Sequence, residues 1–375
     1  MISQLTWRLM GSSMTLADIP TPALLIDVAA MERNIATMAQ FFSEGSCRLR
    51  PHFKAHKTPE IARRQLAAGS CVGLTCATVG EAEAAAGFCE DILIANQVIG
   101  LDKCARVAIL AKSGIDIKVA VDSELGVEQM SKAAQDTETT VGVLVEVNIG
   151  FRAGTPPGEA AVVLGRRISD TPGVELHGLM GYEGPAAGIE ERDGRETMAR
   201  QALDRLLSTV QPFRDAGFPT DIVSAGSTGT YDVTGRMDGI TEIQAGSYVL
   251  MDTAYGKEGL PFEQAFWVLG TVLSRPSQGS VSADCGHKSC SQDHGMPDVR
   301  DVPGATVTFL ADEHAMIAVP PDSTLKPGDR LQLVPSHIDP TINLHDVFYA
   351  LEGDTVVGIW PIEARGYAEQ RMAMG

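Results

Sequence analysis

The feature that most constrains the fold of this 375-residue chain is its regular alternation of short apolar runs with amphipathic segments. The runs are rich in Val, Ile and Leu, and the segments between them carry apolar residues at helical spacing, as in 29–42. This alternation is typical of repeated βα units around a parallel sheet. Eight such units close most naturally into a (β/α)8 barrel. We predict its strands at residues 23–27, 48–53, 73–78, 91–96, 117–122, 141–148, 175–182 and 221–226.

The pattern of predicted elements changes beyond residue 256, where shorter strands are separated by turns rich in Pro, Gly and Asp. Segments 326–329 (Lys-Pro-Gly-Asp) and 352–354 (Glu-Gly-Asp) are typical of tight turns between antiparallel strands. The sequence therefore predicts two domains. A barrel occupies residues 20–256, and residues 257–375 form a C-terminal β-domain that residues 1–19 join.

The charge of the chain excludes two classes of partner. Asp and Glu number 48 against 30 Lys and Arg, and the net charge of −18 repels nucleic acid and anionic membrane surfaces. No apolar run has the length of a membrane span, and residues 1–19 lack the apolar core of a signal peptide. The seven cysteines are odd in number and lack metal-ligand spacing, which favours reduced thiols. We therefore expect a cytoplasmic protein.

A lysine stands where one of the predicted strands ends. Residues 51–58 read Pro-His-Phe-Lys-Ala-His-Lys-Thr, which places Lys54 between His52 and His56 with Lys57 close by. Barrel chemistry lies at such C-terminal strand ends. Neighbouring positive charge and burial lower the pKa of a lysine, so that its amine condenses with an aldehyde such as pyridoxal phosphate. A basic surface turn is the alternative interpretation of these eight residues alone.

Two segments are rich in small residues. The first, 224–231, reads Ser-Ala-Gly-Ser-Thr-Gly-Thr-Tyr, and small side chains there let backbone N–H groups approach a phosphate. A flexible loop is the alternative. The second segment, 244–248, reads Gln-Ala-Gly-Ser-Tyr. Two such cradles and one reactive amine suit a single phosphorylated aldehyde, and the clustered cations Arg48, Arg50, Lys54 and Lys57 suit a pocket for a small anion.

The sequence also contains a candidate cation site. Segment 335–346 includes His337 and Asp339, and in an extended chain residues i and i+2 point the same way. An imidazole and a carboxylate presented together can hold a divalent cation with positions left open for substrate. A lone His-x-Asp is common, so the pair by itself leaves metal binding open.

These motifs together resemble one family. Segments 51–58, 224–231, 244–252, 312–314 and 335–346 occur in the order and approximate spacing of the metal-dependent D-threonine aldolases, whose relatives include D-serine dehydratase and D-3-hydroxyaspartate enzymes. The resemblance extends from Thr21 to Gly366. It implies the alanine-racemase type of fold, in which a pyridoxal phosphate barrel is followed by a β-domain.

The resemblance also implies a set of site residues. Lys54 would bond covalently to pyridoxal phosphate, and His337 with Asp339 would bind the metal, Mn²⁺ first, with Mg²⁺, Co²⁺ or Zn²⁺ as alternatives. A homodimer that acts on a small D-3-hydroxy amino acid is implied as well. The other implied cofactor contacts are His52, Arg152, Tyr182, Ser227, Thr228, Gly229, Gly246, Ser247 and Tyr248.

The chain departs from the family at the expected general base. Where the aldolases carry a histidine after the tyrosine of a late barrel strand, this chain reads Tyr182-Glu183-Gly184-Pro185. The proton of the substrate hydroxyl would then pass either to hydroxide on the metal or to Glu183. A solvated carboxylate has a pKa near ~4, a poor match for an alcohol. Hydroxide on the metal is therefore favoured as the base, and Glu183 is expected to shape substrate choice.

The expected activity is pyridoxal-phosphate- and divalent-metal-dependent retro-aldol cleavage of a D-threonine-like amino acid to glycine and an aldehyde, which makes the protein a carbon–carbon lyase. The alternatives are a D-serine or D-3-hydroxyaspartate dehydratase, an amino-acid racemase, and a non-catalytic pyridoxal phosphate carrier. Asp339 favours the aldolase over the dehydratase, since a carboxylate suits a harder metal than the cysteine that the dehydratases carry there.

Overall fold

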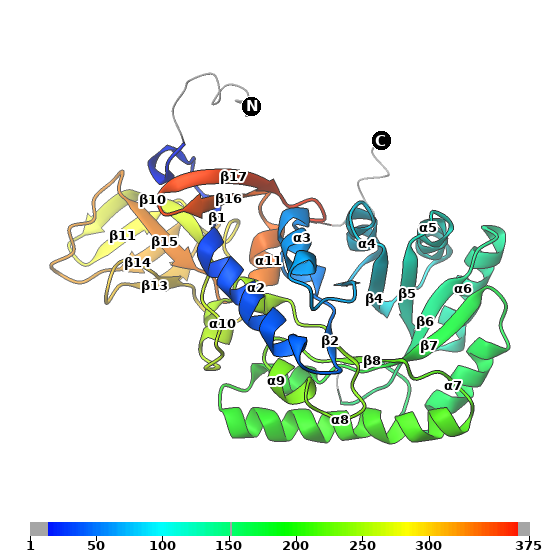
Figure 1. Cartoon of the computed structure of the whole chain (residues 1–375). Coiled ribbons are helices and arrows are strands. Elements are labelled where there is room, and N and C mark those ends of the chain that lie inside the picture. The colour runs from blue at the N-terminus through cyan, green and yellow to red at the C-terminus, as the bar shows by residue number, and fades with distance from the viewer. Residues whose placement is uncertain (1–13, 151, 367–375) are drawn as a thin grey trace. The chain divides into compact units, whose positions relative to one another are not determined.

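The computed structural model describes residues 14–150 and 152–366 (Figure 1). The described chain divides into two compact units. The β unit consists of residues 14–34, 249–257 and 261–366, and the barrel unit consists of residues 35–248 and 258–260. Each unit has a sheet of its own, and the two sheets differ in the direction of their strands.

The barrel unit is built on an eight-stranded sheet in which all neighbouring strands are parallel. The ring closes through parallel bridges from Leu49 to Cys71 and from His52 to Thr75. This closure confirms the predicted (β/α)8 barrel. The strands are β2 (Arg48–Leu49), β3 (Leu74–Cys76), β4 (Asp91–Gln97), β5 (Asp116–Val121), β6 (Val141–Glu146), β7 (Val174–Met180), β8 (Ile222–Ala225) and β9 (Glu242–Ile243).

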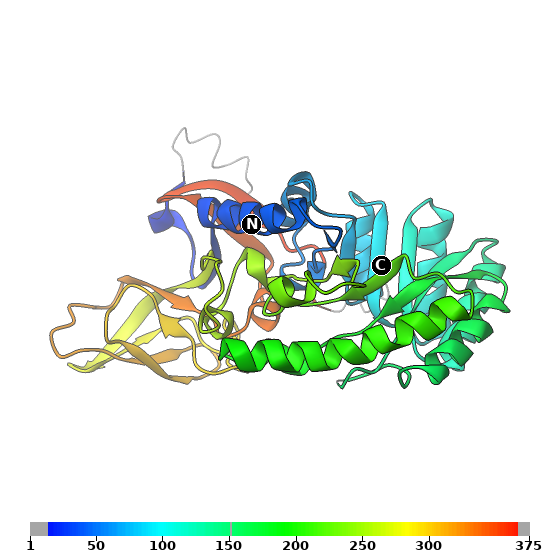
Figure 2. The same cartoon turned by 60° about the horizontal axis from the view of Figure 1, so that its bottom comes forward.

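Helices follow the barrel strands, and local sequence sets where several of them begin. The Thr78 hydroxyl accepts from the Glu81 N–H and Ser123 accepts from the Gly126 N–H, which satisfies free donors in the first turn. Figures 1 and 2 show the longest helix, α8, along the outside of this unit. The helices and turns are α3 (Pro59–Ala67), α4 (Val79–Ala86), α5 (Leu101–Lys112), α6 (Glu124–Asp136), α7 (Glu159–Ser169), α8 (Arg192–Asp215), α9 (Tyr231–Thr234), η2 (Phe53–Ala55) and η3 (Gly184–Gly188).

One predicted barrel strand was wrong. Residues Ala23–Asp27 form β1, which pairs with β10 and β16 in the β unit. The eighth barrel strand is instead β9, which has only two residues and therefore no readable period. An apolar run such as 23–27 is buried in either sheet, so its composition does not say which sheet takes it. Lys54 consequently follows the first strand of the barrel, not the second.

The β unit contains a nine-stranded sheet in the order β11-β14-β13-β12-β15-β10-β1-β16-β17. Of its described pairings, only that of β1 with β16 is parallel. Its later strands are β10 (Phe266–Ser277), β11 (Ser280–Ala283), β12 (Asp298–Val299), β13 (Thr306–Leu310), β14 (Ala315–Ala318), β15 (Arg330–Val334), β16 (Val347–Glu352) and β17 (Thr355–Pro361). Remaining elements of the chain are η1 (Leu16–Asp18), α2 (Val28–Ser43), η4 (Ser247–Val249), α10 (Thr253–Gly256) and α11 (Ile338–Asn343).

The N-terminal segment contributes to the core of the β unit. Leu16 donates its N–H to the carbonyl of Asp354 at 2.8 Å, and Ile19 is fully buried in a cluster with Leu25, Trp267 and Leu269. Residues 1–13, the remainder of the segment predicted to join this domain, lie outside the described residues.

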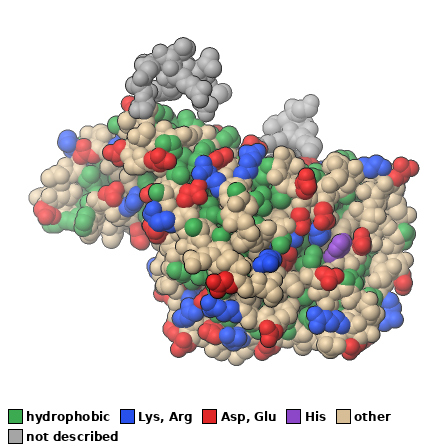
Figure 3. Space-filling view, in the orientation of Figure 1, with side chains coloured by type: hydrophobic (Ala, Val, Ile, Leu, Met, Phe, Trp, Pro, Cys, Tyr) green, Lys and Arg blue, Asp and Glu red, His purple; other side chains and the backbone are tan. Residues whose placement is uncertain are grey.

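All seven cysteines are free thiols in the structure. Figure 3 shows acidic and basic side chains interspersed over the face that it presents. Among the described residues, no helix combines the length and the apolar character needed to cross a bilayer.

Candidate active site

Lys54 lies in the short turn η2, directly beyond strand β2 of the barrel. Phe53 and Ala55 on either side of it are buried and anchor the turn, whereas the lysine side chain is half-buried. His52, the residue before this turn, has an extended backbone and donates its N–H to the carbonyl of Ala245 at 3.0 Å. The turn that carries Lys54 is thereby attached to the beginning of segment 244–248.

The second histidine of the motif has a structural role. His56 is fully buried, and its Nδ1 accepts a hydrogen bond of 3.1 Å from the Thr58 N–H. Its proton is therefore on Nε2, which lies 3.0 Å from Gln65 Oε1. Gln65 in turn donates to the hydroxyl of Tyr248 at 2.9 Å. This chain of hydrogen bonds holds the lysine turn against segment 244–248 and leaves no imidazole nitrogen of His56 for chemistry.

Two of the four clustered cations that were predicted to suit an anion pocket pair with carboxylates of the barrel unit. Arg50 is buried, and its Nε donates to both carboxylate oxygens of Glu242 at 2.9 Å. Its Nη1 donates to Asp91 at 2.6 Å. Lys57 Nζ lies 3.5 Å from Glu81, whose side chain is 2% exposed. Arg50 and Lys57 thus neutralise carboxylates inside the barrel unit instead of offering free charge to a ligand.

The two small-residue segments lie against one another. The backbone N–H of Tyr248 donates to the Thr228 hydroxyl at 3.0 Å. A Cβ at Gly246 would lie 2.8 Å from the His52 carbonyl oxygen, so only glycine lets this segment approach the lysine turn so closely. The structure therefore brings His52, Thr228, Gly246 and Tyr248 together around the turn of Lys54.

The donor set of these segments suits a phosphate. Ser227 and Ser247 are nearly buried hydroxyl donors in segments of small residues. Gly226 has a positive φ of 88°, and a Cβ there would lie 2.8 Å from the Ile243 side chain. Hydroxyls and backbone N–H groups in close-packed turns are typical of phosphate cradles. The residues present fit the phosphate of a pyridoxal cofactor.

Glu183 is completely buried beside the first segment. One carboxylate oxygen accepts from the Gly226 N–H at 3.0 Å, and the other accepts from the hydroxyls of Thr230 and Thr234 at 2.8 and 2.7 Å. These three hydrogen bonds occupy both oxygens. The placement supports a role in shaping the cradle and gives no support to Glu183 as a base or as a residue that contacts substrate.

Arg152 and Tyr182 lie together at neighbouring strand ends. The guanidinium carbon of Arg152 is 5.8 Å from the centre of the Tyr182 ring, within the range of a cation–π contact. Arg152 also donates to the side chain of Asn96 and to the Ala95 carbonyl at the end of β4. Both predicted residues therefore belong to the C-terminal rim of the barrel sheet.

In the β unit, His337 and Asp339 lie at the start of α11. His337 Nε2 is 3.7 Å from Asp339 Oδ2. The expected geometry was wrong, because the segment is not extended: His337 is the residue before the helix and Asp339 lies in its first turn. The Asp252 carboxylate accepts from the Ile338 N–H at 3.0 Å and so fixes this helix start. Burial raises the pKa of Asp252 to about 6.

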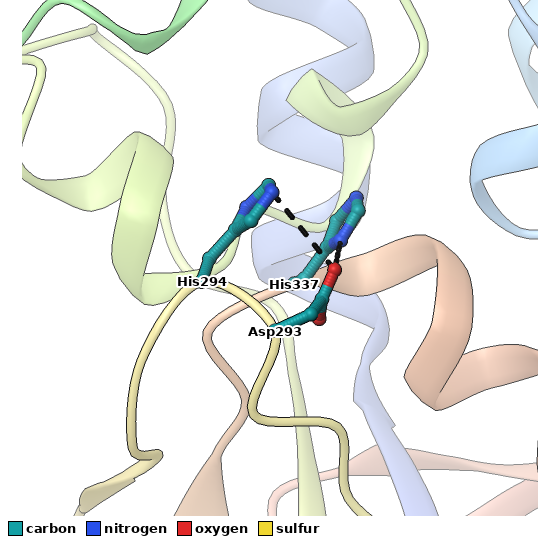
Figure 4. Close-up of side chains that lie close together, drawn as sticks. All are labelled: Asp293, His294 and His337. Atoms are coloured by element: carbon teal, nitrogen blue, oxygen red, sulfur yellow. Dashed lines mark hydrogen bonds and ion pairs between the residues drawn. The ribbon is translucent and has the colours of Figure 1, made fainter.

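The structure adds two residues that the sequence did not indicate. Asp293 Oδ2 lies 2.6 Å from His337 Nδ1, and the His294 ring stacks on the His337 ring at 4.0 Å with 8° between the planes (Figure 4). Ligand atoms of Asp293, His294 and His337 lie within 4.8 Å of one another. Imidazole nitrogens and carboxylate oxygens are both common ligands of divalent ions, so this group together with Asp339 fits a divalent cation.

Two family models match the chain. The model described as "Alanine racemase, N-terminal domain" matches residues 26–254, and a serine dehydratase domain model matches residues 265–351. The sequence is 38% identical to D-threonine aldolase of Arthrobacter sp. over 361 residues, which cover 94% of each chain. It is 33% identical to 3-hydroxy-D-aspartate aldolase of Paracoccus denitrificans, with 93% of each chain covered.

The fold agrees with these sequence relationships. The structure matches the crystal structure of D-threonine aldolase from Filomicrobium marinum with a TM-score of 0.92 and 38% identity, covering 95% of this chain and 98% of that one. This match and the two family models confirm the alanine-racemase type of fold, a (β/α)8 barrel with a β-domain. The chain therefore belongs to the D-threonine aldolase family, whose barrel is that of the alanine racemase N-terminal domain.

Proposed function

We propose that this protein is a pyridoxal-phosphate- and divalent-metal-dependent lyase that cleaves D-3-hydroxy amino acids, D-threonine among them, to glycine and an aldehyde. The observation that carries the proposal is the arrangement of the Lys54 turn against two joined segments of phosphate-binding character. The names of the relatives, D-threonine aldolase and 3-hydroxy-D-aspartate aldolase, support the substrate class.

Each part of the proposed barrel site has one task. Lys54 holds the cofactor aldehyde, and Ser227, Thr228 and Gly229 with Gly246, Ser247 and Tyr248 hold its phosphate. His52 holds the lysine turn in place, and Arg152 with Tyr182 forms the neighbouring rim. When bound, pyridoxal phosphate supplies the electron sink for Cα–Cβ cleavage, and a divalent cation supplies Lewis acidity toward the substrate hydroxyl.

The cation is assigned to His337 and Asp339 in the β unit. Their mixed imidazole and carboxylate donors suit a divalent cation, and we propose Mn²⁺ because the carboxylate favours a harder ion. The sequence left two candidates for the base, one at the cation site and one at Glu183. We retain the candidate at the cation site, because three hydrogen bonds occupy the carboxylate of Glu183. We also propose a cytoplasmic homodimer, and mass measurement by light scattering during size exclusion tests the dimer.

A dehydratase is the second candidate, and the serine dehydratase model that matches residues 265–351 favours it. The two activities differ in their products. An aldolase converts D-threonine to glycine and acetaldehyde, whereas a dehydratase converts D-serine to pyruvate and ammonia. Incubating the holoenzyme with each substrate, with and without EDTA, separates them. Acetaldehyde formation that EDTA abolishes supports the proposal, and pyruvate alone contradicts it.

A further inference from the structure

The ring of His337 lies between two carboxylates that approach different nitrogens. Asp293 Oδ2 is 2.6 Å from Nδ1, and Asp339 Oδ2 is 3.7 Å from Nε2. Figure 4 shows the contact of Asp293 with His337. A neutral imidazole has one N–H donor and one lone pair, and the partner of the donor decides which nitrogen is left to bind a metal.

The two distances decide which carboxylate can bind the same ion as His337. Protein ligands bind a small divalent ion at about 2.1 Å, so two ligands of one ion lie about 3.0 Å apart in octahedral geometry and about 3.4 Å apart in tetrahedral geometry. The 3.7 Å between Asp339 and Nε2 lies just above this range, so the two groups need only a small shift to bind one ion. The 2.6 Å between Asp293 and Nδ1 is too short for two ligands of one ion and matches a strong N–H···O hydrogen bond.

Asp293 is itself held in place. Its Oδ1 accepts a hydrogen bond of 2.5 Å from the Ser291 hydroxyl. The Ser291 N–H donates to the Thr341 hydroxyl at 3.1 Å, and Thr341 is a buried residue of α11. The carboxylate that contacts His337 is thus anchored to the same helix that carries Asp339.

We infer that Asp293 is a positioning residue of the cation site, which accepts the Nδ1–H of His337 and leaves Nε2 free to bind the cation with Asp339. Metal-binding histidines commonly donate their second nitrogen to a carboxylate in this way, which fixes the ring and raises its basicity. The inference rests on the proposed function, because the metal belongs to that proposal. The opposing arrangement has Asp293 and His294 as direct ligands, with His337 bound through Nδ1.

Mn²⁺ binding to the holoenzyme tests the inference without using activity. The protein is stripped with EDTA, and free Mn²⁺ is titrated by electron paramagnetic resonance for wild type and for Asp293→Ala, Asp293→Asn, His294→Ala and Asp339→Ala. Asp322→Ala, which alters an exposed turn residue of the same unit, is the matched control. Far-UV circular dichroism and the melting temperature without metal report whether each variant is folded.

We expect Asp293→Ala to weaken Mn²⁺ binding about 10- to 100-fold, since loss of a carboxylate behind a metal-binding histidine typically has this effect. Asp293→Asn keeps an acceptor oxygen and should recover much of the affinity. Asp339→Ala should lose binding, and His294→Ala should weaken it less than Asp293→Ala.

Two results would overturn this inference and leave the proposed function standing. One is wild-type affinity in Asp293→Ala, and the other is a loss of binding in Asp293→Asn or His294→Ala as complete as in Asp339→Ala. A wild-type protein that binds no Mn²⁺ would refute the inference and the metal requirement of the proposed function together.

Discussion

The carboxylate of Glu183 accepts a hydrogen bond of 3.0 Å from the backbone N–H of Gly226, which directly follows strand β8 in the first small-residue segment. Two threonine hydroxyls, on Thr230 and Thr234, complete its contacts. A buried carboxylate with three donors organises the loop that supplies those donors. Glu183 therefore shapes the loop to which we assign the cofactor phosphate.

Replacing Glu183 by Gln should weaken cofactor binding, because the amide NH₂ faces a donor that the carboxylate oxygen had satisfied. Hydrogen bonds to buried charged groups are worth about 1.5–3 kcal/mol, so we expect pyridoxal phosphate affinity to fall about tenfold or more. At saturating cofactor, kcat should stay within about tenfold of wild type, since general-base loss costs about 10²- to 10⁴-fold. Cofactor titration by absorbance and steady-state kinetics measure both quantities, with the exposed Glu190→Gln as control. A thousandfold fall in kcat with cofactor bound would instead identify Glu183 as the base.

The fold was readable from the sequence where a local pattern determined it. Strands such as β6, which is buried along its whole length, appear as largely apolar runs between helices of clear period. Strand β9 has two residues and no pattern, while Ala23–Asp27 has the pattern but joins the other sheet. Tertiary pairing decides which sheet a strand joins, and neither of these two segments encodes that pairing in its local sequence.

In the candidate site, too, local motifs could be predicted from the sequence and contacts between distant residues could not. Lys54, His337 and the two small-residue segments could be proposed from the sequence because each motif lies within a few consecutive residues. Asp293 lies 44 residues before His337, in a loop without periodicity. Glu183 meets Gly226 across 43 residues. Contacts of this kind arise from the folded chain, and the adjacent Asp-His pair at 293–294 was the one local signal that was available.

Lys54 should be the residue that carries the cofactor. Borohydride treatment of the holoenzyme, followed by peptide mapping, should place the label on Lys54, because this amine lies on the turn held against segment 244–248, which in turn contacts segment 224–231. Lys54→Ala should lose essentially all turnover. Lys57→Ala serves as the matched control and should mainly lower stability, since Lys57 pairs with Glu81. Label found on Lys57 or Lys288 would contradict the assignment.

The buried ion pairs of Arg50 should matter for stability. Arg50→Met leaves Glu242, whose side chain is 5% exposed, without its charge partner. Breaking a buried pair in this way typically costs about 3–5 kcal/mol. Arg200→Met removes an exposed pair with Glu196 on α8 and should change the free energy of unfolding by about 0.3–0.5 kcal/mol. Urea denaturation of both variants provides the comparison. Equal effects would show that the Arg50 network contributes no more than a surface pair.

Asp252 should make stability depend on pH in a definite direction. Burial raises its pKa to about 6, whereas an aspartate in the unfolded chain titrates near ~3.9. The folded state therefore holds the proton more tightly, and the stability gained from protonation is lost as the pH rises from about 4 to 6.

The comparison with Asp252→Asn, whose side chain does not titrate, isolates this effect. The free energy of unfolding of wild type minus that of the variant should fall by about 2–3 kcal/mol across this range, at ~1.4 kcal/mol per pH unit of pKa difference. Chemical denaturation at a series of pH values in EDTA measures it, and Asp322→Asn serves as the exposed control. A difference that stays flat or rises with pH would refute the assignment to Asp252.

The most direct measurement of the central claim is product analysis of the holoenzyme with D-threonine, with Mn²⁺ and after EDTA treatment. We predict equal amounts of glycine and acetaldehyde with Mn²⁺, neither product after EDTA, and neither product from Asp339→Ala at any metal concentration tested. Formation of 2-oxobutanoate and ammonia, epimerisation at Cα without cleavage, or acetaldehyde production that survives complete removal of metal would contradict a metal-dependent aldolase.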